Sequence, residues 1–219
     1  MEQYFSVLEA CPLFEKIDRG DLPGLLGCLG ARVVSRRKNQ VIFAEGDPAT
    51  HVGVVLRGSA QILREDYYGN RSIVAHVDVA ELFAESFACA GIAALPVSVV
   101  AAEDGEFMII ECSRITVSCA NCCSFHNQMV FNMLKVVASN NLVFNQKIEI
   151  TSKRTTREKL MTYLLSQAKQ RGSNSFAIPY DRQALADYLE VDRSAMSAEI
   201  SKLRKEGILE SYRNQFTLL

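Results

Sequence analysis

Short hydrophobic runs recur between about residue 32 and residue 111, with polar stretches between them. The runs are rich in Val, Ile and Phe, and turn-forming pairs such as Arg57-Gly58 and Gly69-Asn70 separate them. Seven runs cover residues 33–34, 41–43, 52–56, 60–63, 73–77, 97–100 and 107–110. Short β-rich runs at this spacing are typical of a small barrel or roll. The pattern predicts an N-terminal antiparallel β-roll of the double-stranded β-helix or jelly-roll kind.

A helical pattern replaces the strand pattern near Phe125 and continues to about residue 150. This segment lacks Gly and Pro, and a series of residues recurs at alternating spacings of four and three. The series consists of Val130, Leu134, Val137, Asn141, Phe144 and Ile148. Such spacing is typical of a coiled-coil seam, and a helix of this length needs a partner surface. We expect it to pair with its copy in a second subunit, with Asn141 fixing the register. The alternative is that the series packs only on its own roll.

The next helix is predicted from a capping signal. Thr155 and Glu158 have the spacing of a capping box, and Gly172 is placed to end the helix. We expect its inward side to carry Leu160, Leu164 and Leu165. A loop and a short strand at residues 176–178 follow.

Two short helices joined by a tight turn are predicted for residues 181–206. Asp181 and Asp192 are placed to cap them. The second helix buries residues at helical spacing, while its other face carries Arg193, Ser194, Ser197, Ser201, Lys202 and Arg204. A small, polar and basic helix face suits the major groove of DNA. Two alternating runs around Arg213-Asn214 then predict a hairpin, which makes the arrangement a winged helix-turn-helix. A helical hairpin with a solvated face is the alternative.

Composition and charge support two domains and a DNA-binding C-terminus. The chain has 219 residues, and its net charge of −1 divides into −5 over residues 1–150 and +4 over residues 151–219. A basic module beside an acidic one fits local contact with phosphates. We therefore predict an α+β protein with a sensor domain at 1–124, a dimerisation helix at 125–150 and a DNA-binding domain at 151–219.

The sequence shows no hydrophobic run long enough for a membrane span and no signal-peptide pattern at its start, so we expect a cytoplasmic protein without a membrane partner. Its seven cysteines are an odd number, which argues against a disulfide framework. An enzyme would need converging acids, bases or nucleophiles. Only Glu85, Cys89 and His76 come near to that, and no motif joins them. We predict that the protein is not an enzyme.

Three segments resemble the Crp/Fnr family of dimeric bacterial transcription regulators. Residues 43–48 with 54–58 are similar to the early strands of the family's cyclic-nucleotide-binding-like sensor roll, and residues 81–86 to the start of its ligand cassette. Residues 192–207 are similar to the recognition helix and its exit. The resemblance covers nearly the whole chain. It implies an allosteric effector, a homodimer on a palindromic operator in double-stranded DNA, and RNA polymerase as a partner.

Departures from the family pattern bear on the signal. In cyclic-nucleotide binders of the family an Arg followed by Ser or Thr closes the cassette and pairs with the cyclic phosphate. Leu95-Pro96 stands there in this chain, and Ala84 replaces the usual Gly before the cassette Glu. We therefore expect no binding of cAMP through the family contacts. An unknown small molecule in a different pocket is the expectation, and a filled pocket is the alternative. The expected lining is Phe83, Glu85, Ser86, Val97 and Ser98, with Asn140 and Asn141 as the roof.

The cysteines leave several interpretations open. The N-terminal cysteine cluster of the family's iron–sulfur branch is missing, so no such cluster is expected. Cys119, Cys123 and His126 share one face if the segment is helical, which fits zinc, another soft metal or haem. Cys119 and Cys122 fit a redox couple, and plain structural thiols are the simplest alternative. No cofactor or metal is predicted with certainty.

The resemblance also suggests which side chains meet DNA. Arg193 occupies the family's Arg position and is expected to reach a guanine or a phosphate. Ser194 and Ala198 replace a Glu and an Arg that read bases in relatives, so we expect a different half-site. Ser197 and Lys202 are expected at base edges or phosphates. Flanking backbone contacts are expected from Arg154, Arg157 and Arg213.

Overall fold

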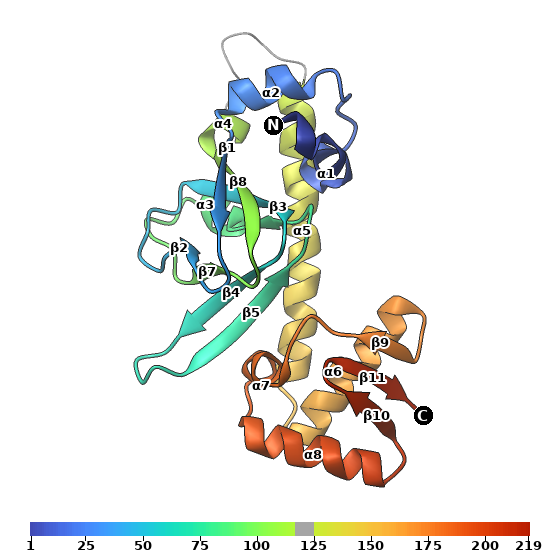
Figure 1. Ribbon diagram of the computed structural model, residues 1–219. Helices are drawn as coiled ribbons and strands as arrows, with labels where there is room; N and C mark the ends of the chain where they lie inside the picture. The colour runs from blue at the N-terminus through green and yellow to red at the C-terminus, as the bar shows by residue number, and fades with distance from the viewer. Residues whose placement is uncertain (117–124) are drawn as a thin grey trace. The chain divides into compact units, whose positions relative to one another are not determined.

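The computed structural model describes residues 1–116 and 125–219 (Figure 1). The described chain forms two compact units. The first comprises Met1–Tyr68 and Val74–Asn141, and the second comprises Gly69–Ile73 and Leu142–Leu219. Each unit buries its own hydrophobic side chains. The mixture of helices and antiparallel strands confirms the predicted α+β class.

The first unit is built on two four-stranded antiparallel sheets with the orders β1-β8-β3-β6 and β2-β7-β4-β5. The strands are β1 (Arg32–Arg36), β2 (Val41–Phe43), β3 (His51–Arg57), β4 (Ala60–Glu65), β5 (Arg71–Val77), β6 (Leu82–Phe83), β7 (Ser98–Ala101) and β8 (Gly105–Glu111). All seven predicted runs form strands. Strand β6 is not among the predicted runs, and its residues lie in the segment 81–86 that resembles the ligand cassette.

The first sheet is buried on both faces, which explains why its strands read as nearly continuous hydrophobic runs. On β8, Phe107 and Ile109 point into the roll and join the cluster between the two sheets. Met108 and Ile110 join a second cluster that the helices of this unit cover. Successive side chains of a strand point to opposite faces, so one strand serves both clusters.

Short helices and the long helix α5 (Phe125–Thr151) supply the second cluster. The short elements are η1 (Glu2–Tyr4), α1 (Phe5–Ala10), η2 (Pro12–Phe14), α2 (Leu22–Leu29), α3 (Glu85–Ala90) and α4 (Ser113–Thr116). Met129, Met133 and Val136 of α5 are buried in this cluster. Asn132 is fully buried, and its side-chain amide donates to the carbonyl oxygens of Leu13 and Glu15 at 2.9 and 2.8 Å. Helix α5 is therefore fixed to the N-terminal segment by polar as well as hydrophobic contacts.

The 4,3 series of α5 lies on a different face from these buried residues. Val130, Leu134 and Ile148 are 43%, 65% and 62% exposed in the single chain. Asn141 is also exposed, while Val137 and Phe144 are half-buried. The predicted long helix is present. Of its seam, Val137 packs against the second cluster, while Val130, Leu134, Asn141 and Ile148 are exposed.

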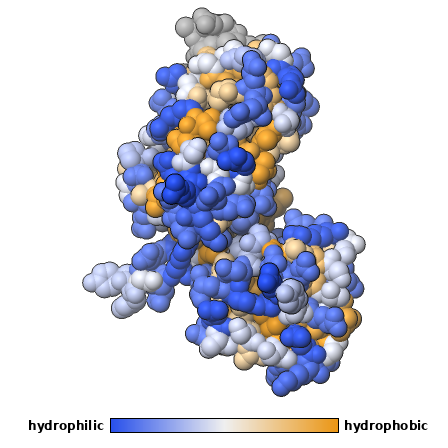
Figure 2. Space-filling model, viewed as in Figure 1, coloured by the Kyte–Doolittle hydropathy of each residue, from blue (hydrophilic) through white to orange (hydrophobic). Residues whose placement is uncertain are grey.

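The second unit contains α6 (Thr156–Arg171), β9 (Ser175–Ala177), α7 (Arg182–Leu189), α8 (Arg193–Lys205), β10 (Leu209–Tyr212) and β11 (Gln215–Leu218). The strands form one antiparallel sheet in the order β10-β11-β9. This is the predicted winged helix-turn-helix. In Figure 2, hydrophilic residues cover most of the visible surface of this unit, with smaller hydrophobic areas between them.

Helix α6 confirms the predicted capping box, because Thr155 and Glu158 exchange the two expected hydrogen bonds. Leu160 and Leu164 are buried as predicted. The inward placement of Leu165 is wrong, since its side chain is 55% exposed and Tyr163 is buried instead. Five residues turn a helix by roughly 140°, which carries Leu165 away from the side of Leu160.

Candidate DNA-binding surface and sensor region

The helix-turn-helix is shaped by two carboxylate caps and one left-handed residue. Asp181 Oδ1 accepts a hydrogen bond of 2.8 Å from the backbone N of Ala184 at the start of α7. Asp192 Oδ1 accepts from the backbone N atoms of Ser194 and Ala195 at 2.8 and 3.0 Å at the start of α8. Between the helices Glu190 has a φ of 53°. Both predicted caps are confirmed.

The cap of α8 is ionised at neutral pH. A hydrogen bond from the Ser194 hydroxyl, helped by the backbone N–H groups of Ala195 and Ser194, holds the pKa of Asp192 below its ordinary value. Ser194 therefore has a local structural partner in addition to its exposed position at the start of α8.

Helix α8 divides into a buried and an exposed face. Met196, Ile200 and Leu203 are buried against the rest of the unit. The predicted DNA-contacting residues Arg193, Ser194, Ala198 and Lys202 are exposed, and Ser197 is half-buried. The structure thus brings these five residues together on one helix, on the side away from the core.

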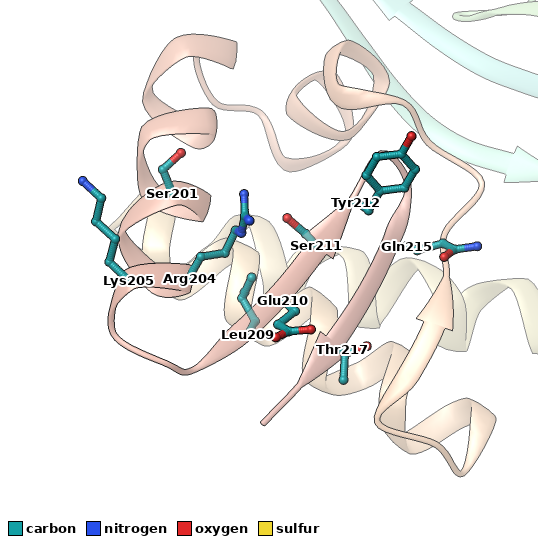
Figure 3. A pocket seen from close by; sticks show the side chains of 9 residues that line it. All are labelled: Ser201, Arg204, Lys205, Leu209, Glu210, Ser211, Tyr212, Gln215 and Thr217. Carbon is teal, nitrogen blue, oxygen red and sulfur yellow. The ribbon is translucent and has the colours of Figure 1, made fainter.

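A groove of about 780 Å³ runs between α8 and the hairpin β10–β11. Its lining residues are Ser201, Arg204, Lys205, Leu209, Glu210, Ser211, Tyr212, Gln215 and Thr217. Figure 3 shows Arg204 reaching from α8 toward β10. Tyr212 is 69% exposed, so the groove offers two cations and an accessible aromatic ring. Such a surface suits a phosphate backbone.

The three flanking arginines have different surroundings. Arg154 is exposed in the segment before α6, and Arg213 is exposed in the turn between β10 and β11, 5.4 Å from the centre of the Tyr212 ring. Arg157 is hydrogen-bonded to carboxylates of its own unit. Its guanidinium holds both carboxylate oxygens of Glu206 at 3.2 and 2.7 Å and lies 3.3 Å from Glu199.

In the sensor unit, Glu85 is the centre of a small buried hydrogen-bond network. Its carboxylate is 4% exposed, and Oε1 accepts from the Ser86 hydroxyl at 2.9 Å and from the Asn140 amide at 2.8 Å. The three predicted pocket residues therefore meet, with Asn140 contributed by α5. Asn141 is exposed and takes no part in this network.

The other predicted pocket residues already have packing or hydrogen-bond partners within the first unit. Phe83 is fully buried, with its ring centre 5.5 Å from that of Phe43 and 6.2 Å from that of Phe107. Val97 is 1% exposed and belongs to the same cluster. The Ser98 hydroxyl accepts a hydrogen bond of 3.0 Å from the backbone N of Glu45. Phe83 and Val97 fill the interior between the sheets.

The predicted cysteine site falls largely on residues 117–124, which lie outside the described residues. Of its members, only His126 is described. His126 is buried, and its Nε2 lies 3.1 Å from the carbonyl oxygen of Arg114. Within residues 1–116 and 125–219, no group of three or more His, Cys, Asp or Glu side chains is placed to hold a metal ion.

Two domain models match the chain. The model of the cyclic nucleotide-binding domain matches residues 33–116, and the Crp-like helix-turn-helix domain matches residues 158–219. The two matches follow each other along the chain in the same order as the β-roll and the winged helix-turn-helix of the structure. This chain belongs to the Crp/Fnr family.

Solved structures of Crp/Fnr regulators share its fold. FixK2 from Bradyrhizobium japonicum is 23% identical and superposes with a TM-score of 0.68 over 86% of this chain and 92% of FixK2. The c-di-GMP responsive global regulator CLP of Xanthomonas campestris is 16% identical, with a TM-score of 0.76 over 92% of this chain and 99% of CLP. A CooA mutant from Carboxydothermus hydrogenoformans is 16% identical, with a TM-score of 0.72 over 97% and 90%. No curated protein sequence matches the chain.

As a Crp/Fnr protein, this chain is a transcription regulator with a sensor domain and a DNA-binding helix-turn-helix. No helix in the described part of the chain is long and hydrophobic enough to cross a lipid bilayer. Two residues of the groove, Lys205 and Tyr212, are not among the residues predicted to contact DNA. The sequence places Tyr212 at the end of a predicted wing strand, which could have suggested a binding role. The groove itself is seen only once the wing packs beside α8.

Proposed function

We propose that this Crp/Fnr protein is a dimeric regulator whose sensor responds to a small-molecule or redox signal other than a cyclic nucleotide. The observation that carries the proposal is Leu95. It stands where cyclic-nucleotide binders of the family have an Arg, and it is 3% exposed within the core between the sheets. A buried aliphatic side chain offers no charge-assisted contact to a cyclic phosphate.

The network around Glu85 supports the same conclusion. Two of its hydrogen bonds already come from Ser86 and Asn140. A ligand that bonded to Oε1 of Glu85 would have to compete with both donors. Calorimetric titration of the full chain with cAMP and with cGMP tests the proposal directly. We expect no heat of binding, and saturable binding of either nucleotide would overturn the proposal.

DNA recognition is proposed to run through α8 and the wing, on a two-fold symmetric operator with half-sites about one helical turn apart. Arg193 is the proposed reader of a guanine or phosphate. Ser194 and Ala198 give the protein a half-site of its own, and Ser197 and Lys202 serve at base edges or phosphates. Arg154 and Arg213 remain proposed backbone contacts. Arg157 is instead proposed to hold α8 in place, because its guanidinium already binds Glu199 and Glu206.

Operator selection from random DNA, followed by fluorescence anisotropy, tests this assignment. Arg193→Ala is expected to weaken specific binding by about 1–3 kcal/mol. Lys169→Ala is the matched control, since Lys169 is exposed on α6 and outside the proposed surface. Equal losses for the two variants, or unchanged affinity for Arg193→Ala, would remove Arg193 from the interface.

Dimerisation is proposed to cover the exposed seam of α5. Leu134→Asp places a charge on the seam, and sedimentation equilibrium is expected to show monomers. Ser139→Asp on the same helix is the control, because Ser139 is exposed and outside the series. A Leu134→Asp protein that remains dimeric would rule out the seam as the interface. RNA polymerase is also proposed as a partner because of the family, and a direct binding assay with purified polymerase tests this.

A further inference from the structure

Two cysteines that are 23 positions apart in the sequence meet in the sensor unit. The Sγ atoms of Cys89 and Cys112 are 3.8 Å apart. Cys89 lies on the last turn of α3, and Cys112 lies between β8 and α4. Both are free thiols. Neither the proposed function nor the predicted cluster around Cys119 uses this pair.

The two cysteines differ in access and in anchoring. Cys112 is 6% exposed, and its backbone N donates to the carbonyl oxygen of Thr50 at 2.9 Å. Cys89 is exposed and lies two residues before Gly91, whose φ of 64° ends the helix. A small oxidant can therefore reach Cys89, while Cys112 stays at a fixed place beside it.

The contact also favours ionisation of the pair at moderate pH. A sulfur hydrogen bond from Cys89 lowers the pKa of Cys112 to about 7, and the same bond raises the pKa of Cys89. One thiolate next to one thiol is the reactive combination, because the thiolate is the nucleophile and the second sulfur can resolve the product.

Cys11 provides the contrast. It is 1% exposed, and burial raises the pKa of its thiol to about 12. A thiol in such surroundings is inert. Among the cysteines of residues 1–116, the pair thus combines an exposed residue, Cys89, with a neighbouring sulfur, that of Cys112, whose thiol pKa is lowered.

We propose that Cys89 and Cys112 form a reversible dithiol–disulfide site that is oxidised by hydrogen peroxide. One thiolate attacks the peroxide, the O–O bond breaks, and a sulfenic acid forms while hydroxide takes up a proton and leaves as water. The second thiol then displaces the sulfenic oxygen as a second water. The two cysteines lose two electrons and two protons, and one peroxide becomes two waters. Bond formation shortens the sulfur distance from 3.8 Å to about 2.05 Å, a movement that the exposed end of α3 can provide.

The disulfide would tie α3 to the junction of β8 and α4. Glu85 stands one helical turn before Cys89 on the same helix, and it holds the Asn140 amide at 2.8 Å. Oxidation is expected to change this hydrogen bond and so to reach α5. This consequence rests on the proposed function, whereas the chemistry at the two sulfurs does not.

The test is a non-reducing peptide map of the full chain before and after treatment with hydrogen peroxide. After the treatment and before digestion, the remaining free thiols are blocked by alkylation so that they cannot exchange with a disulfide. Digestion with trypsin and Glu-C together separates Cys89, on residues 86–103, from Cys112, on residues 112–114. The cysteines at 119, 122 and 123 fall on a third peptide, residues 115–135. We expect peptides 86–103 and 112–114 to appear as one species, two hydrogens lighter than their sum, and to separate again after dithiothreitol.

Cys89→Ser is expected to abolish the linked species, and Cys28→Ser to leave it unchanged, since Cys28 is half-buried on α2. The proposal is overturned if peptide 112–114 stays alkylated after treatment, or if it joins peptide 115–135 instead. Hydrogen exchange of the α3 amides in the reduced and the oxidised protein then measures the local structural effect of the disulfide, and it needs no DNA. A protein that never binds DNA would overturn the proposed function and leave the peptide map intact, so the two failures are distinguishable.

Discussion

The side-chain amide of Asn140 donates a hydrogen bond of 2.8 Å to the carboxylate of Glu85. This contact joins α5 to the start of α3, across 55 positions of sequence. Glu85 is 4% exposed, so water cannot replace the donor. The buried carboxylate and the helix amide therefore depend on each other, and a change at the sensor roll can reach α5 through this bond.

Asn140→Ala removes a donor from this buried carboxylate. We expect the free energy of unfolding to fall by about 1–3 kcal/mol, because a buried carboxylate loses one of its two donors. Urea denaturation followed by circular dichroism measures the change. Asn145→Ala, at an exposed position of the same helix, is expected to change stability by less than about 0.5 kcal/mol. Equal effects would show that the Asn140 contact adds nothing beyond helix propensity.

Gly53→Ala tests whether Phe83 fills the sensor roll. A Cβ at Gly53 would lie 1.9 Å from the Phe83 ring, and Phe83 is fully buried. Overpacking of this kind is expected to cost about 1–3 kcal/mol of stability or more. The control is Gly20→Ala, since no atom lies within 4 Å of the Cβ it would add. A neutral Gly53→Ala would mean that the ring has room to move and that the pocket can open for a ligand.

The ion pair between Arg157 and Glu206 is expected to give α8 a pH-dependent support. Hydrogen bonding to Arg157 holds the pKa of Glu206 below its ordinary value of 4.5. The stabilisation is therefore present above about pH 4.5 and is lost as the pH falls through the lowered folded-state pKa. Relative to the parent protein, Arg157→Met should lower Tm at pH 7, and by a smaller amount at pH 3.

Arg171→Met is the control for Arg157→Met, because Arg171 is an exposed arginine of the same helix. Differential scanning calorimetry at the two pH values supplies the comparison. A deficit in Tm that is equally large at pH 3 and pH 7 would assign the effect of Arg157 to packing of its stem instead of to the ion pair.

Lys147 is expected to make the second unit more stable as the pH rises from 8 to 10. Lys147 is 8% exposed, and its ammonium group bonds to the carbonyl oxygen of Tyr188 and lies 3.8 Å from the centre of the Tyr188 ring. Burial lowers the pKa of Lys147 from 10.5 to about 8. The unfolded chain therefore holds more protons in this range, and stability increases with pH.

Lys147→Met removes this titration, so urea midpoints of the variant should rise less between pH 8 and pH 10. Slopes are compared between proteins because burial raises the pKa of Tyr188 to about 12, so ionisation of the unfolded tyrosine opposes the rise in stability near pH 10. Lys169→Met, at an exposed position, should keep the slope of the parent protein. Parallel slopes for Lys147→Met and the parent protein would contradict the lowered pKa.

Local patterns predicted much of this fold. Short runs rich in Val, Ile and Phe identify every strand of the sensor sheets except β6, and the caps at Thr155, Asp181 and Asp192 identify the starts of three helices. These signals work because a cap and its backbone partners, or the successive residues of a strand, lie within a few positions of one another. The same argument placed Leu165 on the wrong side of α6, since spacing alone does not say how wide a buried face is.

Contacts between distant segments depended on the tertiary structure. The register of β3 with β6 places Phe83 over Gly53, and the packing of α5 brings Asn140 to Glu85. The sequence predicts a DNA contact for Arg157 and gives no sign of its ion pair with Glu206, which the structure shows. The sulfurs of Cys89 and Cys112 meet because α3 lies beside the end of β8, and nothing in their spacing indicates it. Sequence by itself determined the elements, their caps and the family, because these depend on neighbours along the chain. Tertiary structure alone decided which side chains share a site, because sheet register and helix packing set those distances.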